Sequence, residues 1–336
     1  MILVLLAPAC FVPGASAAET NAAPPLFDRK AGPYAVEILR YDWFDASRNR
    51  TVPVKIYYPG GAAGPFPVIV FSHGLGGSRE GYAYLGRHWA GCGYVSVHVQ
   101  HLGSDSAVWE DAPLGDVLQN LRRSGANLAN VTNRPLDVRF AIDQLVILNQ
   151  TNSPLKQRLD LDRIGVAGHS FGAFTTLAIA GETFVARNGM PVTMSDPRVK
   201  AAIPMSSPVP FIKARLDEAF GSIRIPCLHM TGTRDASPIG ETTPQERRLP
   251  FDHSNHADRF LITFKDGDQM IFSGRARMRG GEKDAAFQKL ICIASTAFWD
   301  GYLKGDASAK AWFEGGGLQG VLGEMGTFEM KLSRKY

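Results

Sequence analysis

One serine placed between two glycines constrains this chain more than any other feature. Gly168-His169-Ser170-Phe171-Gly172 follows the apolar run 164–167 directly and opens the apolar, helically spaced stretch 171–180. The glycines permit a sharp turn from strand into helix, which presents the serine hydroxyl above the end of the strand. The N-terminus of the following helix offers backbone N–H groups to a developing negative charge. We therefore expect Ser170 to be a nucleophile.

The rest of the chain alternates between strand-like and helix-like patterns. Short, continuous apolar runs are typical of strands buried on both faces, and helically spaced stretches separate them. This alternation predicts an α/β fold with a mostly parallel sheet and helices on both of its faces. The alternating runs 34–41 and 51–58 predict an antiparallel N-terminal hairpin. The expected buried strands span residues 67–71, 94–99, 164–167, 199–203, 225–230 and 260–264, and the expected helices residues 134–149, 171–180 and 283–303.

The chain divides into a leader and one domain. Residues 1–17 are mostly apolar and end in a small-x-small pattern, which is typical of a signal peptide and predicts a secreted or periplasmic protein. Residues 18–32 are rich in alanine and proline and are expected to be flexible, and residues 33–336 are expected to form a single domain. Stretches 103–131 and 207–221 interrupt the alternation and are either lid elements or plain surface loops. No other segment approaches the roughly 18 apolar residues that a transmembrane helix needs.

Charge and cysteines favour neither a nucleic-acid partner nor a metal site. The net charge is +4, and the densest basic stretch, 275–279, has no interleaved aromatic residues, so it is interpreted as a solvated surface. Beyond the signal peptide there are three cysteines, Cys92, Cys227 and Cys292, which we expect to pack as small apolar side chains. Their spacing suits no metal, and no cofactor is expected. The sequence does not indicate an oligomeric state.

Two further segments supply the expected partners of Ser170. The loop 72–77 follows strand 67–71 at the place where a backbone donor to an oxyanion is expected, so we predict the N–H groups of Leu75 and Phe171 as the oxyanion hole. His73 is expected to shape this loop. Asp235 lies a few residues beyond strand 225–230, where the acid of a catalytic triad is expected.

Taken together, these segments make the chain resemble a known group of enzymes. His73-Gly74-Leu75-Gly76, Gly168–Gly172 and Thr231–Asp235 resemble the platelet-activating-factor acetylhydrolase and dienelactone-hydrolase-like branch of the α/β-hydrolases, over most of residues 65–300. The resemblance implies the α/β-hydrolase fold and a serine ester hydrolase acting on a small-molecule ester or lipid. It also implies Ser170, Asp235 and a histidine after the last strand as the triad. A serine at the nucleophile position favours the esterase side of this branch.

The expected histidine is missing. Lys265–Phe272 resembles the histidine loop of this branch, but Gln269 stands where the histidine is expected. A glutamine amide has no titratable site near neutral pH and cannot accept the serine proton as imidazole does. Two hypotheses therefore stay open: an ester hydrolase acting through an acyl-enzyme at Ser170, impaired or served by another base, and a non-catalytic ligand-binding protein.

Other candidate bases are less suitable. His253 and His256 precede the last strand and are expected to start from the opposite edge of the sheet, although a long loop could carry one of them to Ser170. His101 follows strand 94–99 on the correct edge and is interpreted as a pocket-wall residue. His169 is expected to pack away from the nucleophile. Asp268 could act only as a weak base, because an ordinary carboxylate is poorly matched to a serine hydroxyl.

Overall fold

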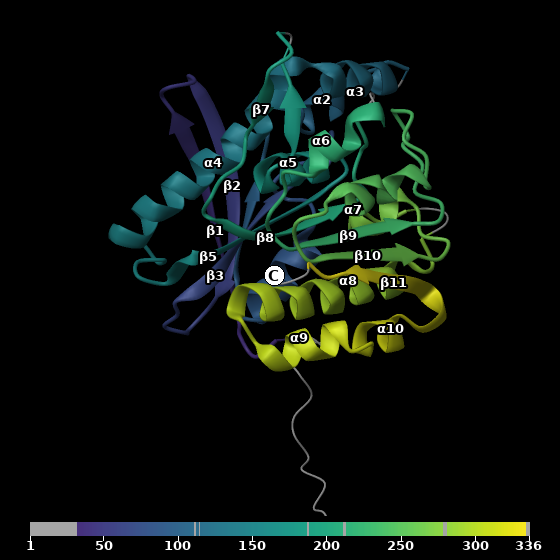
Figure 1. The fold of residues 1–336 in the computed structure, drawn as a ribbon. Helices are drawn as coiled ribbons and strands as arrows, with labels where there is room; N and C mark the ends of the chain where they lie inside the picture. Colours follow the sequence, from purple (N-terminus) through teal and green to yellow (C-terminus); the bar gives the residue numbers. More distant parts are fainter. Residues whose placement is uncertain are drawn as a thin grey trace, which may run out of the picture.

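A nine-stranded sheet organises the chain (Figure 1). The computed structural model describes residues 32–110, 112–113, 115–186, 188–210, 213–277 and 281–333. The expected signal peptide and all but the last residue of the expected leader lie outside these ranges. The strands are β1 (Val36–Asp45), β2 (Arg50–Pro59), β3 (Phe66–Ser72), β4 (Val95–Val99), β5 (Leu159–His169), β8 (Val199–Met205), β9 (Cys227–Gly232), β10 (Arg259–Phe264) and β11 (Gly326–Lys331).

The order of the strands confirms the predicted sheet. They lie in the order β1-β2-β4-β3-β5-β8-β9-β10-β11, and every neighbouring pair from β4 to β10 is parallel. β1 and β2 form the predicted antiparallel hairpin, which pairs Val36 with Pro59 and Asp45 with Arg50. β11 adds an antiparallel strand at the other edge. Because parallel strands end at one edge of the sheet, the loops after β3, β5, β9 and β10 meet there.

Helices cover both faces of the sheet. Along β3, Ile69 and Phe71 belong to one buried apolar cluster, whereas Val68 and Val70 belong to a second cluster on the opposite face. The first cluster includes side chains of α1, α8, α9 and α10, and the second includes side chains of α4, α5 and α6. The α-helices are α1 (Ala83–Gly91), α2 (Ala107–Glu110), α3 (Val117–Ala126), α4 (Leu128–Gln150), α5 (Phe171–Ala180), α6 (Leu216–Phe220), α7 (Leu249–His253), α8 (Asp284–Trp299), α9 (Ala307–Glu314) and α10 (Gly317–Leu322).

Several elements differ from the sequence prediction. α4 begins before the predicted residue 134, because the side chain of Asn127 caps it by accepting from the N–H of Ala129 at 2.9 Å. The helix predicted over 283–303 consists of α8 and a π-helical turn, Asp300–Lys304. α2 and α3 occupy the stretch 103–131, and a small separate hairpin of β6 (Thr183–Val185) and β7 (Pro191–Thr193) follows α5.

The cysteines pack as predicted. Cys92 and Cys292 belong to the apolar cluster under α1 and α8, Cys227 belongs to the cluster on the other face, and no disulfide joins the three. None of the helices in the described residues has the length and apolar character needed to cross a bilayer.

Candidate active site

Ser170 occupies a strained turn between β5 and α5. Its backbone has φ 55° and ψ −117°, a conformation that is unusual for a residue with a side chain, and its N–H donates to the carbonyl of Met205 at 2.9 Å. Neither flanking glycine can be replaced without a shift, since a Cβ on Gly168 would lie 2.3 Å from the carbonyl oxygen of Gly172. A Cβ on Gly172 would lie 1.9 Å from the carbonyl oxygen of Ser72. The close packing of α5 on β3 therefore fixes where Ser170 stands.

The predicted oxyanion donors lie on the two segments that meet beside Ser170. Phe171 is the first residue of α5, so its N–H has no carbonyl acceptor within the helix. Leu75 lies in the loop after β3, and backbone bonds hold this loop on both sides of it. Gly74 N–H donates to the hydroxyl of Tyr82 at 3.2 Å, and Gly76 N–H donates to the carbonyl of Ser104 at 2.9 Å.

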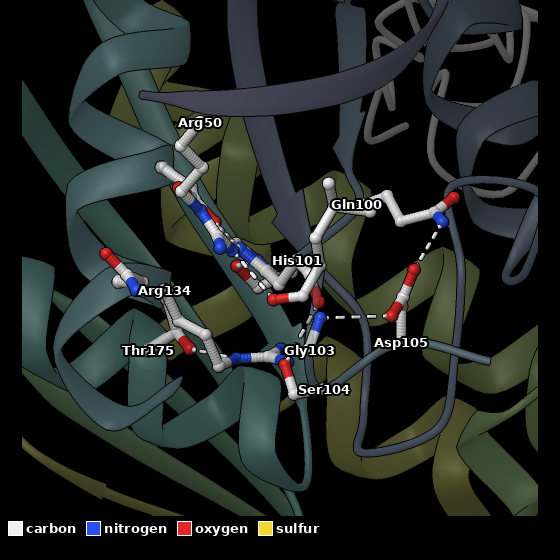
Figure 2. Close-up of polar contacts among 12 residues, drawn as sticks. Arg50, Gln100, His101, Gly103, Ser104, Asp105, Arg134 and Thr175 are labelled. Atoms are coloured by element: carbon white, nitrogen blue, oxygen red, sulfur yellow. Dashed lines mark hydrogen bonds and ion pairs between the residues drawn. The ribbon is translucent and has the colours of Figure 1, made fainter. Parts of the chain in front are cut away.

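A buried arginine ties these segments together, which the sequence did not indicate. Figure 2 shows Arg134 reaching Ser104 and Thr175, and its guanidinium donates to their hydroxyls at 2.9 and 3.0 Å. It also donates to the carbonyl of His73 and lies 4.5 Å from the centre of the Phe171 ring. Burial lowers the pKa of Arg134 to about 9. This one side chain thus contacts loop 72–77, helix α5 and the loop after β4.

His101 belongs to a second buried network and not to a pocket wall. Its Nδ1 lies 3.0 Å from a carboxylate oxygen of Asp137, and its Nε2 lies 3.0 Å from the hydroxyl of Ser72. Asp137 also accepts from Arg50 at 2.8 Å. The relative exposures of Ser72, His101 and Asp137 are 2%, 0% and 0%, so no substrate reaches this serine despite the triad-like connectivity. Burial lowers the pKa of His101 to about 3. The pocket-wall interpretation of His101 is wrong.

Asp235 is fully buried at the end of β9. Its two carboxylate oxygens accept from the hydroxyls of Ser206 and Thr231, both at 2.8 Å, and Arg247 Nε lies 3.4 Å from one of them. Burial raises the pKa of Asp235 to about 6 against the opposing effects of Arg247 and the two hydroxyls. Within the described residues, no hydrogen bond joins this carboxylate to Gln269.

Gln269 lies against Ser170. It is the first residue of a 3-10 turn, Gln269–Phe272, and its Nε2 donates to Ser170 Oγ at 2.7 Å. Asp268 caps this turn by accepting from Met270 N–H at 2.9 Å, and it pairs with Arg277 at 2.6 Å. The amide nitrogen of Gln269 therefore contacts Ser170 directly, and the ion pair of Asp268 holds the turn.

No hydrogen bond joins a histidine ring to Ser170, and all eight histidines of the sequence lie in the described residues. His73 shapes its loop as predicted, because its Nδ1 lies 2.7 Å from the carbonyl of Gly74 and its Nε2 accepts from the N–H of His101. His169 turns to the hydroxyl of Tyr82, 2.8 Å from its Nδ1. None of these rings is placed to take the serine proton.

The two late histidines lie before β10, as predicted. His253 pairs with Asp217 at 2.7 Å, and His256 is exposed in the turn that leads into the strand. Both therefore start from the edge of the sheet opposite Ser170.

The basic run is only partly a solvated surface. Arg277 is largely buried and pairs with Asp268 and Asp284, so the prediction of free solvation is wrong for this residue. Arg275 is exposed, but it donates to the carbonyl of Gly76 at 3.1 Å. Residue 279 lies outside the described residues.

The stretch 103–131 packs on loop 72–77. Trp109 of α2 donates from its indole N–H to the carbonyl of Gly76 at 2.7 Å, and Arg275 lies 5.8 Å from the Trp109 ring. This stretch therefore forms part of the surroundings of the site. In the sequence, this stretch could be recognised because it interrupts the alternation of strands and helices. No sequence pattern predicted the contact between Trp109 and Gly76.

Comparisons with known proteins find a family model and relatives with similar sequences. A family model described as "Platelet-activating factor acetylhydrolase, isoform II" matches residues 46–112. A platelet-activating factor acetylhydrolase from Cavia porcellus is 24% identical over 291 residues, which cover 78% of this chain and 63% of that protein. Cutinase 2 from Thermobifida cellulosilytica is 25% identical over 203 residues, 60% of each chain.

These alignments span less than two thirds of either relative's length. The relatives are ester hydrolases by name. The structure has the mostly parallel sheet and the N-terminal hairpin predicted from the sequence, and Ser170 stands at the turn between β5 and α5. The chain therefore has the α/β-hydrolase fold, and its sequence is similar to the branch that contains the platelet-activating factor acetylhydrolases.

Proposed function

We propose that this protein is an exported serine carboxylic-ester hydrolase that acts, slowly, through an acyl-enzyme at Ser170. The observation that carries the proposal is the half-buried Ser170, held at φ 55° and ψ −117° beside the N-terminus of α5. The names of the relatives support an ester or lipid substrate. The signal-peptide pattern in residues 1–17 supports export to the periplasm or the medium.

The reaction proceeds by acyl transfer. Ser170 Oγ attacks the carbonyl carbon of the ester, and the N–H groups of Leu75 and Phe171 donate to the oxygen that becomes negative. Collapse of this intermediate breaks the bond to the alcohol, which leaves with a proton and leaves the acyl group on Ser170. Water then hydrolyses the acyl-enzyme and restores the serine.

Proton transfer is the weak step of this mechanism. The amide of Gln269 donates to Ser170 Oγ, so it orients the hydroxyl but accepts no proton from it. Removing the histidine of a serine-protease triad costs about 10⁶-fold in turnover. We therefore expect acylation by water-assisted proton loss, far slower than in an enzyme with an imidazole at this place.

The test is direct detection of the acyl-enzyme. The full chain is incubated with a short-chain nitrophenyl ester, and its intact mass and the peptide that carries Ser170 are measured. We expect one acyl group on Ser170 and none in Ser170→Ala, while Ser308→Ala, at an exposed serine of α9, acylates like the parent. Equal turnover by the parent and Ser170→Ala contradicts the proposal.

The contact of Gln269 with Ser170 also favours a second function, a non-catalytic ligand-binding protein. An amide that donates to Ser170 Oγ accepts no proton from it, so an ester bound beside Ser170 would stay uncleaved. In that case a slowly hydrolysed ester binds the parent and Ser170→Ala with equal affinity, and no acyl group is found on the protein.

A further inference from the structure

A cavity beside α5 is lined by none of the residues assigned to the proposed ester chemistry. It has a volume of about 840 Å³ and lies between α5, the β6–β7 hairpin, the segment after β8 and α6. Most of its wall is apolar, and the lining includes Phe174, Phe184, Pro191, Val209 and Ala219. The rings of Phe174 and Phe184 lie 5.4 Å apart, so the wall has an aromatic side. Its shape and lining suit an apolar molecule.

One carboxyl group in this wall has no partner. Glu182 lies two residues after the end of α5, lines the cavity and is only 3% exposed. Within the described residues its carboxyl makes neither a hydrogen bond nor an ion pair, and burial raises its pKa to about 8. Among the described residues of the lining, the other charged ones are Arg215 and Glu218, which pair with each other at 2.8 Å. Buried polar groups in proteins are nearly always bonded, so Glu182 points to a partner from outside the chain.

The buried carboxyl and the apolar wall of the cavity indicate which kind of ligand binds there. A protonated amine pairs with the carboxylate of Glu182 and satisfies it, whereas an anion would be repelled by the same carboxylate. The aromatic side accepts a cation or an alkyl chain. We propose that this cavity binds a hydrophobic primary amine, with the ammonium group on Glu182 and the apolar body between Phe174, Phe184 and Val209. On binding, the amine stays protonated, and the carboxyl of Glu182 releases its proton to the solvent.

Calorimetry on the full-length protein tests the proposal with three eight-carbon probes, octylamine, octan-1-ol and octanoate. We expect octylamine to bind about tenfold or more tightly than octan-1-ol, because only the amine forms a charged hydrogen bond. Glu182→Gln, which is close to isosteric, removes this preference and leaves the binding of octan-1-ol unchanged. Glu241→Gln makes the same chemical change at an exposed position outside the cavity lining and leaves the binding of octylamine unchanged. Ser170→Ala also binds octylamine like the parent, which separates this cavity from the ester site.

The pH dependence gives an independent readout. The affinity for octylamine rises between pH 6 and pH 8, as the release of the Glu182 proton becomes less costly, and Glu182→Gln loses this dependence. Glu218→Gln keeps this pH dependence of octylamine binding, which excludes the pair of Arg215 and Glu218 as the source of the dependence. Ala219→Trp fills the cavity and abolishes binding of both octylamine and octan-1-ol.

Four results would overturn the proposal. Equal binding of octylamine and octan-1-ol means an apolar cavity without a charge partner, and tighter binding of octanoate means that Glu182 acts as a donor. Unchanged octylamine binding in Glu182→Gln means that the carboxyl is not the contact. Unchanged binding in Ala219→Trp means that the amine binds elsewhere.

Discussion

The amide nitrogen of Gln269 lies 2.7 Å from Ser170 Oγ, although 99 residues separate the two in the chain. An imidazole nitrogen at this place would accept the serine proton, whereas the amide nitrogen donates a proton of its own. Asp235 is buried at the end of β9, next to β10 and the loop that carries Gln269. We propose that the frame of a triad is present and that it lacks only its proton acceptor.

The role of Asp235 is testable once an imidazole is present. In Gln269→His we expect Asp235→Asn to remove most of the gained activity, by up to about 10⁴-fold, because the carboxylate orients the imidazole and stabilises its charged form. In the parent, Asp235→Asn changes the rate little, since Gln269 carries no proton to stabilise. The measurement is kcat for a nitrophenyl ester in the four proteins of this cycle. A loss of equal size in both backgrounds would contradict the role proposed for Asp235.

Arg277 is expected to position residue 269 through its ion pair with Asp268. In the Gln269→His background we expect Arg277→Gln to lower kcat about tenfold with little change in KM, because the turn that holds the imidazole loosens. Arg234→Gln, which breaks the exposed pair of Arg234 and Asp266 in the neighbouring loop, serves as the matched control. Identical kcat values for the two variants would show that the pair of Arg277 and Asp268 does not position the base.

Arg134 is expected to contribute strongly to stability. Arg134→Met leaves the carbonyl of His73 and the hydroxyls of Ser104 and Thr175 without this donor, so we expect the free energy of unfolding to fall by about 2–4 kcal/mol. Arg139→Met makes the same change at an exposed position of α4 and should alter stability by less than about 0.5 kcal/mol. Urea denaturation measures both variants. Equal stabilities would show that the buried guanidinium contributes nothing net.

The buried histidines predict a loss of stability in acid. Burial lowers the pKa of His88 to about 4 and the pKa values of His98, His101, His169 and His229 to about 3. In the unfolded chain these groups take up protons near pH 6.5. Below that pH the unfolded state therefore binds more protons than the folded state, and the free energy of unfolding falls as the pH falls.

Two carboxyls oppose this trend. Burial raises the pKa of Asp235 to about 6 and that of Glu182 to about 8, so both keep protons in the folded state that they lose on unfolding. Burial also lowers the pKa of His73, so six histidines outnumber the two carboxyls. Each group contributes up to about 1.4 kcal/mol per pH unit, so the net fall between pH 6 and pH 5 is about 5 kcal/mol. Urea denaturation at both pH values tests this, and His88→Gln should reduce the fall by about 1.4 kcal/mol. Equal stability at the two pH values would contradict the burial of these rings.

The buried strands could be predicted from the sequence, but the last edge strand could not. The run predicted at 260–264 is β10 to within one residue, because a strand covered on both faces must be apolar throughout. β11 carries Glu329 and Lys331 and is mostly exposed or half-buried. Its position depends on pairing with β10, a long-range contact that leaves no pattern in its own residues.

Site residues that follow a recognisable strand could be predicted from the sequence. Site residues whose role depends on contacts with distant parts of the chain could not. Ser170 and Gln269 were identified because each follows a recognisable strand, although their catalytic roles stay predictions. Arg134 lies in an ordinary helical pattern, and only the packing of α4 on α5 makes it a buried cation that bonds to the oxyanion loop. His101 was misinterpreted for the same reason, because its partner Asp137 comes from α4, 36 residues away.

The most direct test of the account compares ester hydrolysis by the full chain with hydrolysis by Gln269→His, with Ser170→Ala as the blank. We predict that the histidine variant turns over a short-chain nitrophenyl ester about 10²–10⁴-fold faster than the parent, with the gain absent when Ser170 is replaced. A rate that stays equal to that of the parent would contradict the claim that the frame lacks only its proton acceptor.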